Sequence, residues 1–498
     1  MNASSDENSA PSPEQCPTGE EEGSLLSRPA PSTIQSGGIS RTIWRLALPT
    51  WGAFVLLNLM GIIDMFFVGK LGPAAVAAVT MGGIMIGIVV MLALGVAMGT
   101  TALVANAFGR DDPEDANAVT AQGLTIAVFL AAFLASICLP LAPVIIQAMG
   151  GSPEVVAEGA TYLRIVAGGG IALLVQIALG AALRGAGDAI TPMKAMISAI
   201  IVNMVLDPIL IFGMFGFPAL GVAGSAWATV IGRGVATLLM VAVLLSDGRS
   251  PLSLKVHQMA PRIDIIKRIF RIGIFASGRA LLRNISRLAL MRLAAMFGTP
   301  AVAAFGICFR LQMLILGPGN GFGTAAATMV GQNLGAGQPE RGERSGWIAA
   351  GTAMAVGVGF TALFWGAPHL LIRVFNRDPE VVRIGVNLLR WFAGSFPLLL
   401  GGFVLGQAMT GAGDSLRPML ITGVSQVLIG LPLAGTLAAR WESAEGIWVG
   451  FFVGNILMGV LSAAVFYRGK WKTVDVTPAE LPSSAPTETV REMPRENG

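Results

Sequence analysis

The segment RGAGDAITPM at residues 184–193 returns as TGAGDSLRPM at residues 410–419, a displacement of 226 positions from 184 to 410. The same displacement relates GPAAVAA at 72–78 to GTPAVAA at 298–304, and it relates two further pairs of segments. One displacement that holds across separated segments indicates two structural repeats with the same order of elements. In a strongly apolar chain, such repeats are typical of membrane transporters.

Composition places the chain outside the range of soluble globular proteins. Its 498 residues are 54% hydrophobic and 12% charged, with a mean hydropathy of +0.70. A bilayer is crossed by about 20 mainly apolar residues, and the chain offers twelve such segments, six in each repeat. We therefore predict an all-α polytopic membrane protein. Twelve transmembrane helices would form two six-helix repeats, an N-lobe and a C-lobe, around a central cavity.

The polar segments give the expected boundaries. Residues 1–40 and 469–498 are rich in Ser, Pro, Thr and Glu and are expected to be disordered tails. Between them we expect the N-lobe at 41–247, a linker at 248–265 and the C-lobe at 266–468. Lys and Arg gather before the first span, in the linker and after the last span, so both termini are expected to be cytoplasmic. The protein would be a multi-pass component of the cell (inner) membrane.

Several functional classes find no support in the sequence. No basic block carries interleaved aromatic residues, which argues against a nucleic-acid partner. The two His and three Cys lack metal-ligand spacing, and no GxxxxGK[ST] loop is present. We expect no enzyme activity, no cofactor, and no metal beyond a possible Na⁺. The expected partners are the lipid bilayer and a small-molecule substrate, with the protein acting as a monomer.

Two carboxylates fall inside predicted spans, and only in the first repeat. Asp64 lies in LLNLMGIIDMFFVG and Asp207 in AIIVNMVLDPILIFG. The positions shifted by 226 hold Leu290 and Leu433 instead. A charged side chain near the bilayer centre costs about 2.5–3.5 kcal/mol even on the most lenient scale. Such a residue faces the protein interior and is functional by default.

Polar groups near Asp207 suggest what the carboxylates bind. Asn203 precedes Asp207 by four residues and therefore shares its helix face. Pro208 follows directly and weakens the local backbone hydrogen bonding. With Asp64 and the hydroxyl of Thr229 on the next helix, these groups would form a shell of oxygen ligands for a small cation. They could equally hold a shared proton, because two adjacent carboxylates resist simultaneous ionisation.

The seventh predicted span carries an unusual basic stripe. Arg279, Arg283 and Arg287 recur every fourth residue and so lie along one side of a helix. Lipid exposure would be costly, so the stripe is expected to face the cavity or the protein interior. A cavity-facing stripe would favour anionic or zwitterionic substrates; alternatively, the arginines bond to helix ends and backbone carbonyls. Asn58 and Asn284, related by the same displacement, could bind substrate or serve helix packing.

Taken in order, several motifs resemble one transporter family. They are the Asp64 segment, TALVANAFG at 101–109, VNMVLDP at 202–208, GVAGSAWATVIG at 221–232 and MVGQNLGAGQPERG at 329–342. Together they resemble the multidrug and toxic compound extrusion (MATE) transporters over essentially all of residues 40–470. The resemblance implies two six-helix lobes around a central cavity. It also implies export of small organic compounds or drugs in exchange for H⁺ or Na⁺ by alternating access.

The same resemblance assigns roles to individual positions. Asp64, Asn203, Asp207 and Thr229 match the N-lobe cation or proton site of the branch that includes archaeal members and DNA-damage-inducible protein F. Pro49 matches the proline at which the first helix of the family bends. Other branches carry acidic residues in the seventh and tenth spans, and this chain has none there. An alternative function is a lipid-linked precursor flippase of the same superfamily, and a membrane-embedded hydrolase is a more distant one.

Overall fold

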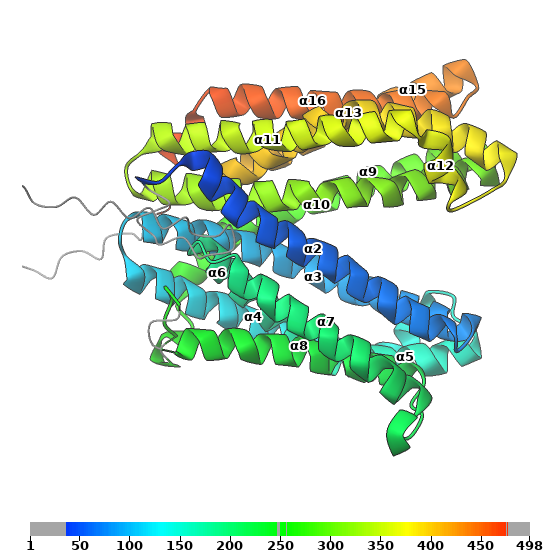
Figure 1. The fold of residues 1–498 in the computed structure, drawn as a ribbon, viewed down its shortest axis with the longest axis horizontal. Helices are drawn as coiled ribbons and strands as arrows, with labels where there is room; N and C mark the ends of the chain where they lie inside the picture. The colour runs from blue at the N-terminus through cyan, green and yellow to red at the C-terminus, as the bar shows by residue number, and fades with distance from the viewer. Residues whose placement is uncertain (1–35, 247–249, 255, 475, 477–498) are drawn as a thin grey trace, which may run out of the picture.

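The computed structural model describes residues 36–246, 250–254, 256–474 and 476. Most of both predicted tails and a part of the predicted linker lie outside these described residues. The described residues form helices and connecting turns, without a strand. Figure 1 shows the helices as two bundles that lie side by side along the long axis of the molecule.

The chain order gives six spans in each repeat. The first repeat contains α2 (Ile39–Gly69), α3 (Pro73–Gly109), α4 (Pro113–Ala148), α5 (Pro153–Gly168), α6 (Gly170–Gly185), α7 (Ile190–Phe212), η1 (Met214–Gly216) and α8 (Val222–Leu245). After η2 (Val256–Met259), the second contains α9 (Ile263–Ala295), α10 (Thr299–Gly335), α11 (Pro339–Gly366), α12 (Pro368–Arg373), α13 (Pro379–Gly411), α14 (Leu416–Thr422), η3 (Gly423–Gly430), α15 (Leu431–Trp441) and α16 (Glu445–Tyr467). A final short helix, η4 (Lys470–Thr473), follows.

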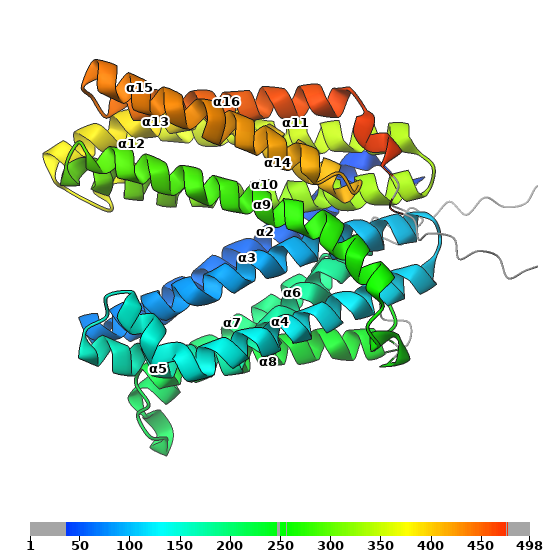
Figure 2. The same cartoon turned by 180° about the vertical axis from the view of Figure 1, so that it is seen from behind.

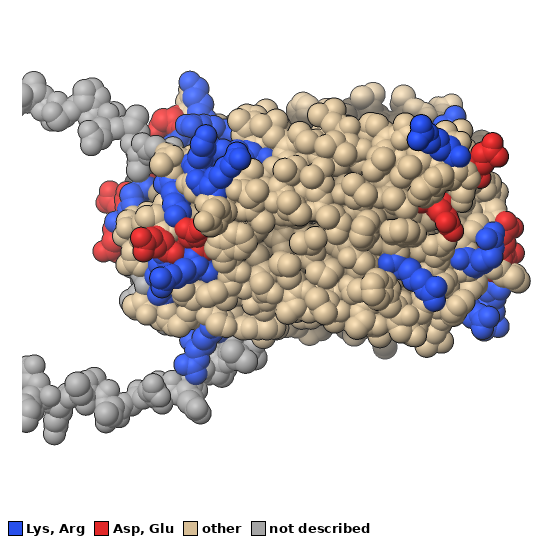
Figure 3. All heavy atoms as spheres, turned by 90° about the horizontal axis from the view of Figure 1, so that it is seen from above, with Lys and Arg blue, Asp and Glu red and all other residues tan. Residues whose placement is uncertain are grey.

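The span count agrees with the predicted fold class. In the described residues, ten helices are long and apolar enough to cross a membrane, with α14, η3 and α15 counted as one. The bent pair α5 and α6, which meet at 47°, makes an eleventh. Helix α9 carries the arginine stripe, but its 33 residues reach about 50 Å, so it spans by length. Charged side chains gather at the two ends of the face in Figure 3 and leave an uncharged band between them.

Local sequence signals explain where these helices begin. Proline stands at the first turn of several of them, where its missing N–H costs nothing. Asp378 caps α13 by accepting from the backbone N–H groups of Glu380 and Val381. Asp188 and Asp414, in the two GAGD segments, also accept backbone N–H groups at the next helix start. Each of these two aspartates therefore caps the helix that follows its GAGD segment.

Each lobe has its own apolar core, and the first helix of each repeat contributes to the core of the other lobe. Ile43 and Leu46 of α2 lie in the core of the second repeat. Ile265 and Ile269 of α9 lie in the core of the first repeat. Helices α2 and α9 occupy equivalent positions in the two repeats. They therefore cross between the lobes in a symmetric exchange, which Figures 1 and 2 show from opposite sides.

Close backbone approaches make this exchange possible. A Cβ atom on Gly95 of α3 would lie 2.6 Å from the carbonyl oxygen of Gly273 on α9. A Cβ atom on Gly321 of α10 would lie 2.7 Å from the carbonyl oxygen of Ala47 on α2. These two pairs are related by the repeat displacement of 226. The small residues at these positions let each crossing helix pack directly on its neighbour's backbone.

The two bundles touch at one end and diverge toward the other. We call the end that holds the starts of α2, α4 and α11 the terminal end, and the opposite end the loop end. At the terminal end, Thr328 and Gln332 of α10 donate to the carbonyl oxygens of Arg184 and Gly185 on α6, each at 2.9 Å. Toward the loop end the helices of the two lobes separate in both views (Figures 1 and 2).

Two local features were not anticipated from sequence. The predicted tail at 469–498 does not begin as a disordered segment, because η4 is helical and Trp471 within it is fully buried. The Trp471 ring stacks on Phe466 at 4.7 Å between centroids, which holds the chain against the C-lobe. In addition, η3 is a π-helix of eight residues inside the eleventh span. Wide turns of this kind often occur at functional sites.

Candidate functional site

The two intramembrane carboxylates meet inside the N-lobe. Asp64 is carried by α2, Asn203 and Asp207 by α7, and Thr229 by α8. The Asn203 amide donates to Asp64 Oδ1 at 3.2 Å and to Asp207 Oδ1 at 3.4 Å. The Thr229 hydroxyl donates to Asp64 Oδ2 at 3.3 Å. The four residues singled out from the sequence therefore form one cluster, which we call the carboxylate cluster.

Two oxygen atoms of the carboxylate cluster have unused hydrogen-bonding capacity. Asn203 and Asp207 are fully buried. Among the described residues, Asn203 Oδ1 and Asp207 Oδ2 find no hydrogen-bond partner. Leaving buried polar atoms unsatisfied costs about 1–3 kcal/mol each. Both atoms are acceptors, so the group that would satisfy them is a proton donor or a cation.

An arginine near the carboxylate cluster was missed in the sequence analysis. Arg233 follows Thr229 by one turn of α8 and lies close enough to Asp64 to interact with it electrostatically. Its guanidinium donates to Gln176 on α6 at 3.4 Å. The i, i+4 spacing from Thr229 was a usable signal. The charge of the site therefore includes one arginine as well as two carboxylates.

A separate cavity of about 300 Å³ lies between the lobes. It is lined by Thr50, Ala53, Phe54, Leu57, Met91, Leu94, Gly95, Ala97, Met98, Thr101, Arg184, Met196, Ala276, Arg279, Ala280, Arg283, Asn320, Thr324, Phe403 and Gln407. These residues come from both repeats, as a central substrate cavity requires. Leu57 and Leu94 are 39% and 51% exposed, so the cavity is accessible from outside.

Two arginines of the predicted stripe line the cavity. Arg279 is 7% exposed, and its Nη2 donates to Gln407 Oε1 at 2.8 Å. The guanidinium groups of Arg279 and Arg283 lie 5.6 and 5.3 Å from the centre of the Phe403 ring. Arg184, which the sequence analysis did not select, also lines the cavity and comes from the first repeat.

The other candidates for substrate binding lie elsewhere. Arg287 stacks on Phe309 at 3.7 Å and is not among the described residues that line the cavity. The Asn58 amide donates to the carbonyl oxygen of Phe54 on its own helix at 2.8 Å. Asn284 contacts Met91 Sδ at 3.5 Å. Neither asparagine is among the described residues that line the cavity.

Helix α2 connects the cavity with the carboxylate cluster. Thr50, Phe54 and Leu57 line the cavity, and Asp64 lies two turns further along the same helix. Pro49 is buried inside α2, and in this conformation the helix continues through it. Because proline has no N–H, the helix lacks one backbone hydrogen bond there. The helix can therefore bend more easily at Pro49 than a helix with a full set of backbone hydrogen bonds.

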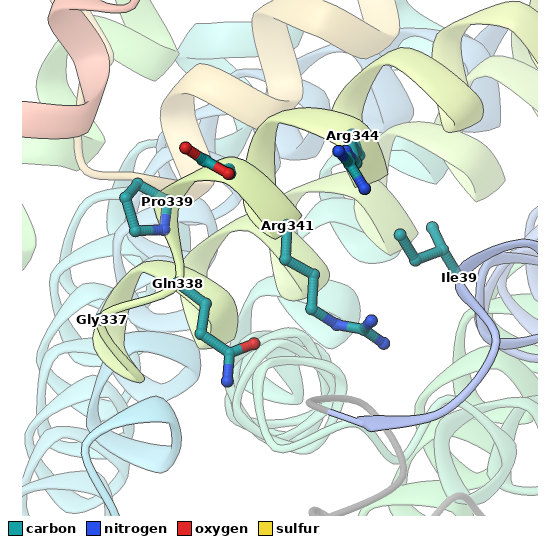
Figure 4. Close-up of a pocket in the computed structure, with 7 residues that line it drawn as sticks. Ile39, Gly337, Gln338, Pro339, Arg341 and Arg344 are labelled. Atoms are coloured by element: carbon teal, nitrogen blue, oxygen red, sulfur yellow. The ribbon is translucent and has the colours of Figure 1, made fainter.

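The start of α2 is fastened to the C-lobe at the terminal end. A surface pocket of about 470 Å³ is lined by Ile39 and by the turn between α10 and α11. Figure 4 shows Arg341 between Ile39 on one side and Gln338 and Pro339 of this turn on the other. Arg341 of α11 donates to the carbonyl oxygen of Gly37, just before α2. Asp115, at the position equivalent to Arg341, binds Arg268 of α9 at 2.9 Å. Both crossing helices are thus anchored at their starts. The anchor of α2 is a hydrogen bond to a backbone carbonyl oxygen, and the anchor of α9 is an ion pair.

Comparison with known proteins places these features in context. The family model MatE matches residues 49–209 and 277–436, one segment in each repeat. A probable multidrug resistance protein NorM of Thermotoga maritima is 29% identical over 87% of this chain and 93% of that protein. An FAD transporter of Shewanella oneidensis is 26% identical over 86% of this chain and 94% of that protein.

A solved structure supports the fold independently. It is described as the outward-facing conformation of a multidrug resistance MATE family transporter of the MOP superfamily. It superposes with a TM-score of 0.81 at 24% identity, over 89% of this chain and 98% of that chain. The two-lobe arrangement is therefore shared with a known transporter fold.

Proposed function

Because the chain belongs to the MatE family of multidrug efflux transporters, we propose that it exports small organic compounds in exchange for H⁺ or Na⁺ by alternating access. Members of this family are transporters rather than enzymes. The observation that carries the coupling proposal is the carboxylate cluster, with its two unsatisfied acceptor oxygens. The flippase alternative gains no support, since the relatives described above are drug or FAD transporters.

The charges of the site suggest one coupling cation per cycle. Asp64 and Asp207 carry two negative charges when ionised, and nearby Arg233 balances one of them. One H⁺ or Na⁺ would neutralise the remainder. A single charge moving through 100 mV supplies about 2.3 kcal/mol, or roughly a 50-fold concentration ratio. That is sufficient for one-to-one exchange to expel a compound.

Helix α2 is the proposed moving part. Its start is anchored on the C-lobe, while Asp64 near its other end belongs to the N-lobe cluster. Binding of the cation would change the contacts of Asp64 and so favour one conformation of α2 over another. Because the same helix lines the cavity, that change would alter the affinity for the exported compound.

We further propose how the protein is oriented in the membrane and that it acts as a monomer. The protein would lie in the cell membrane as a monomer, with the terminal end and both termini in the cytoplasm, since Lys and Arg gather in the short loops of that end. The lobe contacts at the terminal end and the accessible cavity then correspond to an outward-open state.

A counterflow experiment tests this function. The purified protein is reconstituted in vesicles, and the uptake of a fluorescent dye is followed under an imposed pH gradient or an imposed Na⁺ gradient. We expect one of the two gradients to drive the dye above its equilibrium concentration. If neither gradient does so with protein shown to be folded, the antiport proposal is wrong.

Replacing Pro49 by alanine tests the role of α2. Alanine restores the missing N–H and favours a straight helix by about 1–3 kcal/mol. If this free energy adds to the barrier for bending α2, transport should slow by about 10- to 100-fold. Substrate affinity should change little, because Pro49 is not among the described cavity-lining residues.

The matched control is Pro143→Ala in α4, another proline inside a span. That change should leave turnover close to the wild-type value. Equal turnover in Pro49→Ala and wild-type protein would show that α2 does not bend during the cycle.

A further inference from the structure

We propose that the central cavity is an anion-binding site, formed by Arg184, Arg279 and Arg283, which takes organic anions with a carboxylate or phosphate group on an apolar or aromatic body. The proposal rests on the transport function proposed above and names its substrate class.

Three arginines from the two repeats line the cavity. Arg184 comes from the end of α6, and Arg279 and Arg283 come from successive turns of α9. Gly406 on α13 leaves space for one of them, because a Cβ atom there would lie 2.6 Å from Arg279 Nη1. Arg279 is therefore built into the packing of the cavity wall.

Nothing acidic in the described part of the chain neutralises this site. The residues that line the cavity include no Asp or Glu. The ion pairs among the described residues involve Arg110, Arg262, Arg268, Arg417 and Lys472, and none of the three cavity arginines. The positive charge of the cavity is therefore available to a ligand.

Arg279 supplies a second, independent observation. It is 7% exposed, and its Nε is buried without a hydrogen-bond partner among the described residues. Its one recorded bond, to Gln407, uses Nη2 and is to a neutral acceptor. This unsatisfied N–H donor belongs to a side chain that lines the cavity, and an oxyanion acceptor would satisfy it. A guanidinium fork also matches carboxylate and phosphate geometry.

The remaining lining selects the body of the ligand. Phe54, Phe403, Met91 and Met98 give apolar and aromatic surface around the arginines. The volume of about 300 Å³ falls at the lower limit of small-molecule pockets. The site thus suits a compact organic anion better than an inorganic ion alone.

Equilibrium binding tests the proposal with two dyes that share one xanthene core but carry opposite charge. These are carboxyfluorescein, an anion, and rhodamine 123, a cation. Binding to the purified full-length protein is measured in detergent by fluorescence anisotropy. We expect the wild-type protein to prefer the anion by about tenfold or more, the usual effect of charge-assisted hydrogen bonds.

Arg283→Gln removes one charge while keeping a polar side chain. It should reduce the anion preference by about tenfold. Arg287→Gln is the matched control, since Arg287 lies one turn further on the same helix but outside the lining. It should change the preference by less than about twofold. If Arg283→Gln does not fold, Arg184→Gln provides the same test from the other repeat.

Competition defines the group that is recognised. Displacement of bound carboxyfluorescein by benzoate or by phenyl phosphate supports the site and tells which head group it prefers. Equal displacement by benzylammonium, or an unchanged dye preference in folded Arg283→Gln protein, overturns it. Binding is measured without a gradient, so it can fail while counterflow succeeds, and the reverse also holds. The two proposals can therefore fail separately.

Discussion

Asp64→Asn and Asp207→Asn are each expected to abolish gradient-driven export while leaving the protein folded. Each change removes a carboxylate that would bind the coupling cation and keeps the size of the side chain. Without a charge change in the site, the gradient cannot bias the two conformations. We expect uphill transport to fall by at least about 100-fold, the loss that results when a coupling energy of about 3 kcal/mol disappears.

Folding of these variants is favoured by the local hydrogen bonding. A new amide at position 207 could donate to Asn203 Oδ1, which has no partner among the described residues. At position 64, the Thr229 hydroxyl can still donate to the remaining oxygen. We therefore expect the thermal unfolding midpoint of both variants to stay close to that of the wild-type protein.

The measurement is dye accumulation in vesicles under the gradient found to drive the wild-type protein. Asp264→Asn serves as the control, since Asp264 is exposed at the start of α9 and pairs with the exposed Arg262. It should transport normally. Uphill transport at the wild-type rate in both carboxylate-cluster variants would remove that cluster from the mechanism.

The second large effect is expected at the contact between the lobes. Gly335→Ala places a Cβ atom 2.2 Å from the carbonyl oxygen of Asn106 on α3. Gly109, its partner in the repeat, faces the Gln332 carbonyl oxygen at 2.1 Å in the same way. Backbone atoms cannot move aside as a flexible side chain can, so the new Cβ atom should destabilise this contact between the lobes by about 1–3 kcal/mol. The closed terminal end should therefore become about 10- to 100-fold less populated, and transport should fall with it.

Spin labels at Glu114 and Glu340 report this opening directly. Both residues are exposed, begin α4 and α11, and are related by the repeat displacement. Pulsed electron resonance should show longer distances in Gly335→Ala than in wild-type protein. Gly351→Ala is the control: it lies inside α11 with no atom within 4 Å of a new Cβ. Alanine at position 351 should slightly stabilise α11 and leave the distances between the spin labels unchanged. Identical distance distributions in the Gly335 variant and wild type would contradict the proposed closure.

Much of the fold could be predicted because its signals are local or periodic. Length and hydropathy predicted the spans, and the fixed displacement predicted two equivalent lobes. The prediction failed at Trp471, where a polar-looking segment is held by one buried aromatic side chain. Composition averages over such a residue and so misses it.

The carboxylate cluster could be predicted from the sequence because its signals are also local or periodic. A charged residue inside an apolar span stands out, and the i, i+4 spacing places Asn203 and Asp207 on one face of α7. Arg233 has the same spacing from Thr229 and could have been found. The arginine stripe was harder, since periodicity aligns Arg279, Arg283 and Arg287 without saying what each one faces.

The sequence by itself determined the two repeats, the twelve spans and the confinement of the intramembrane carboxylates to the first repeat. Only the tertiary structure decided that α2 and α9 cross between the lobes, that Arg184 joins Arg279 and Arg283, and that Arg287 does not. The physical reason is that helical periodicity fixes which residues share a face of one helix. Which neighbour that face meets depends on how helices far apart in the chain pack, and here backbone contacts at Gly95 and Gly321 set that packing.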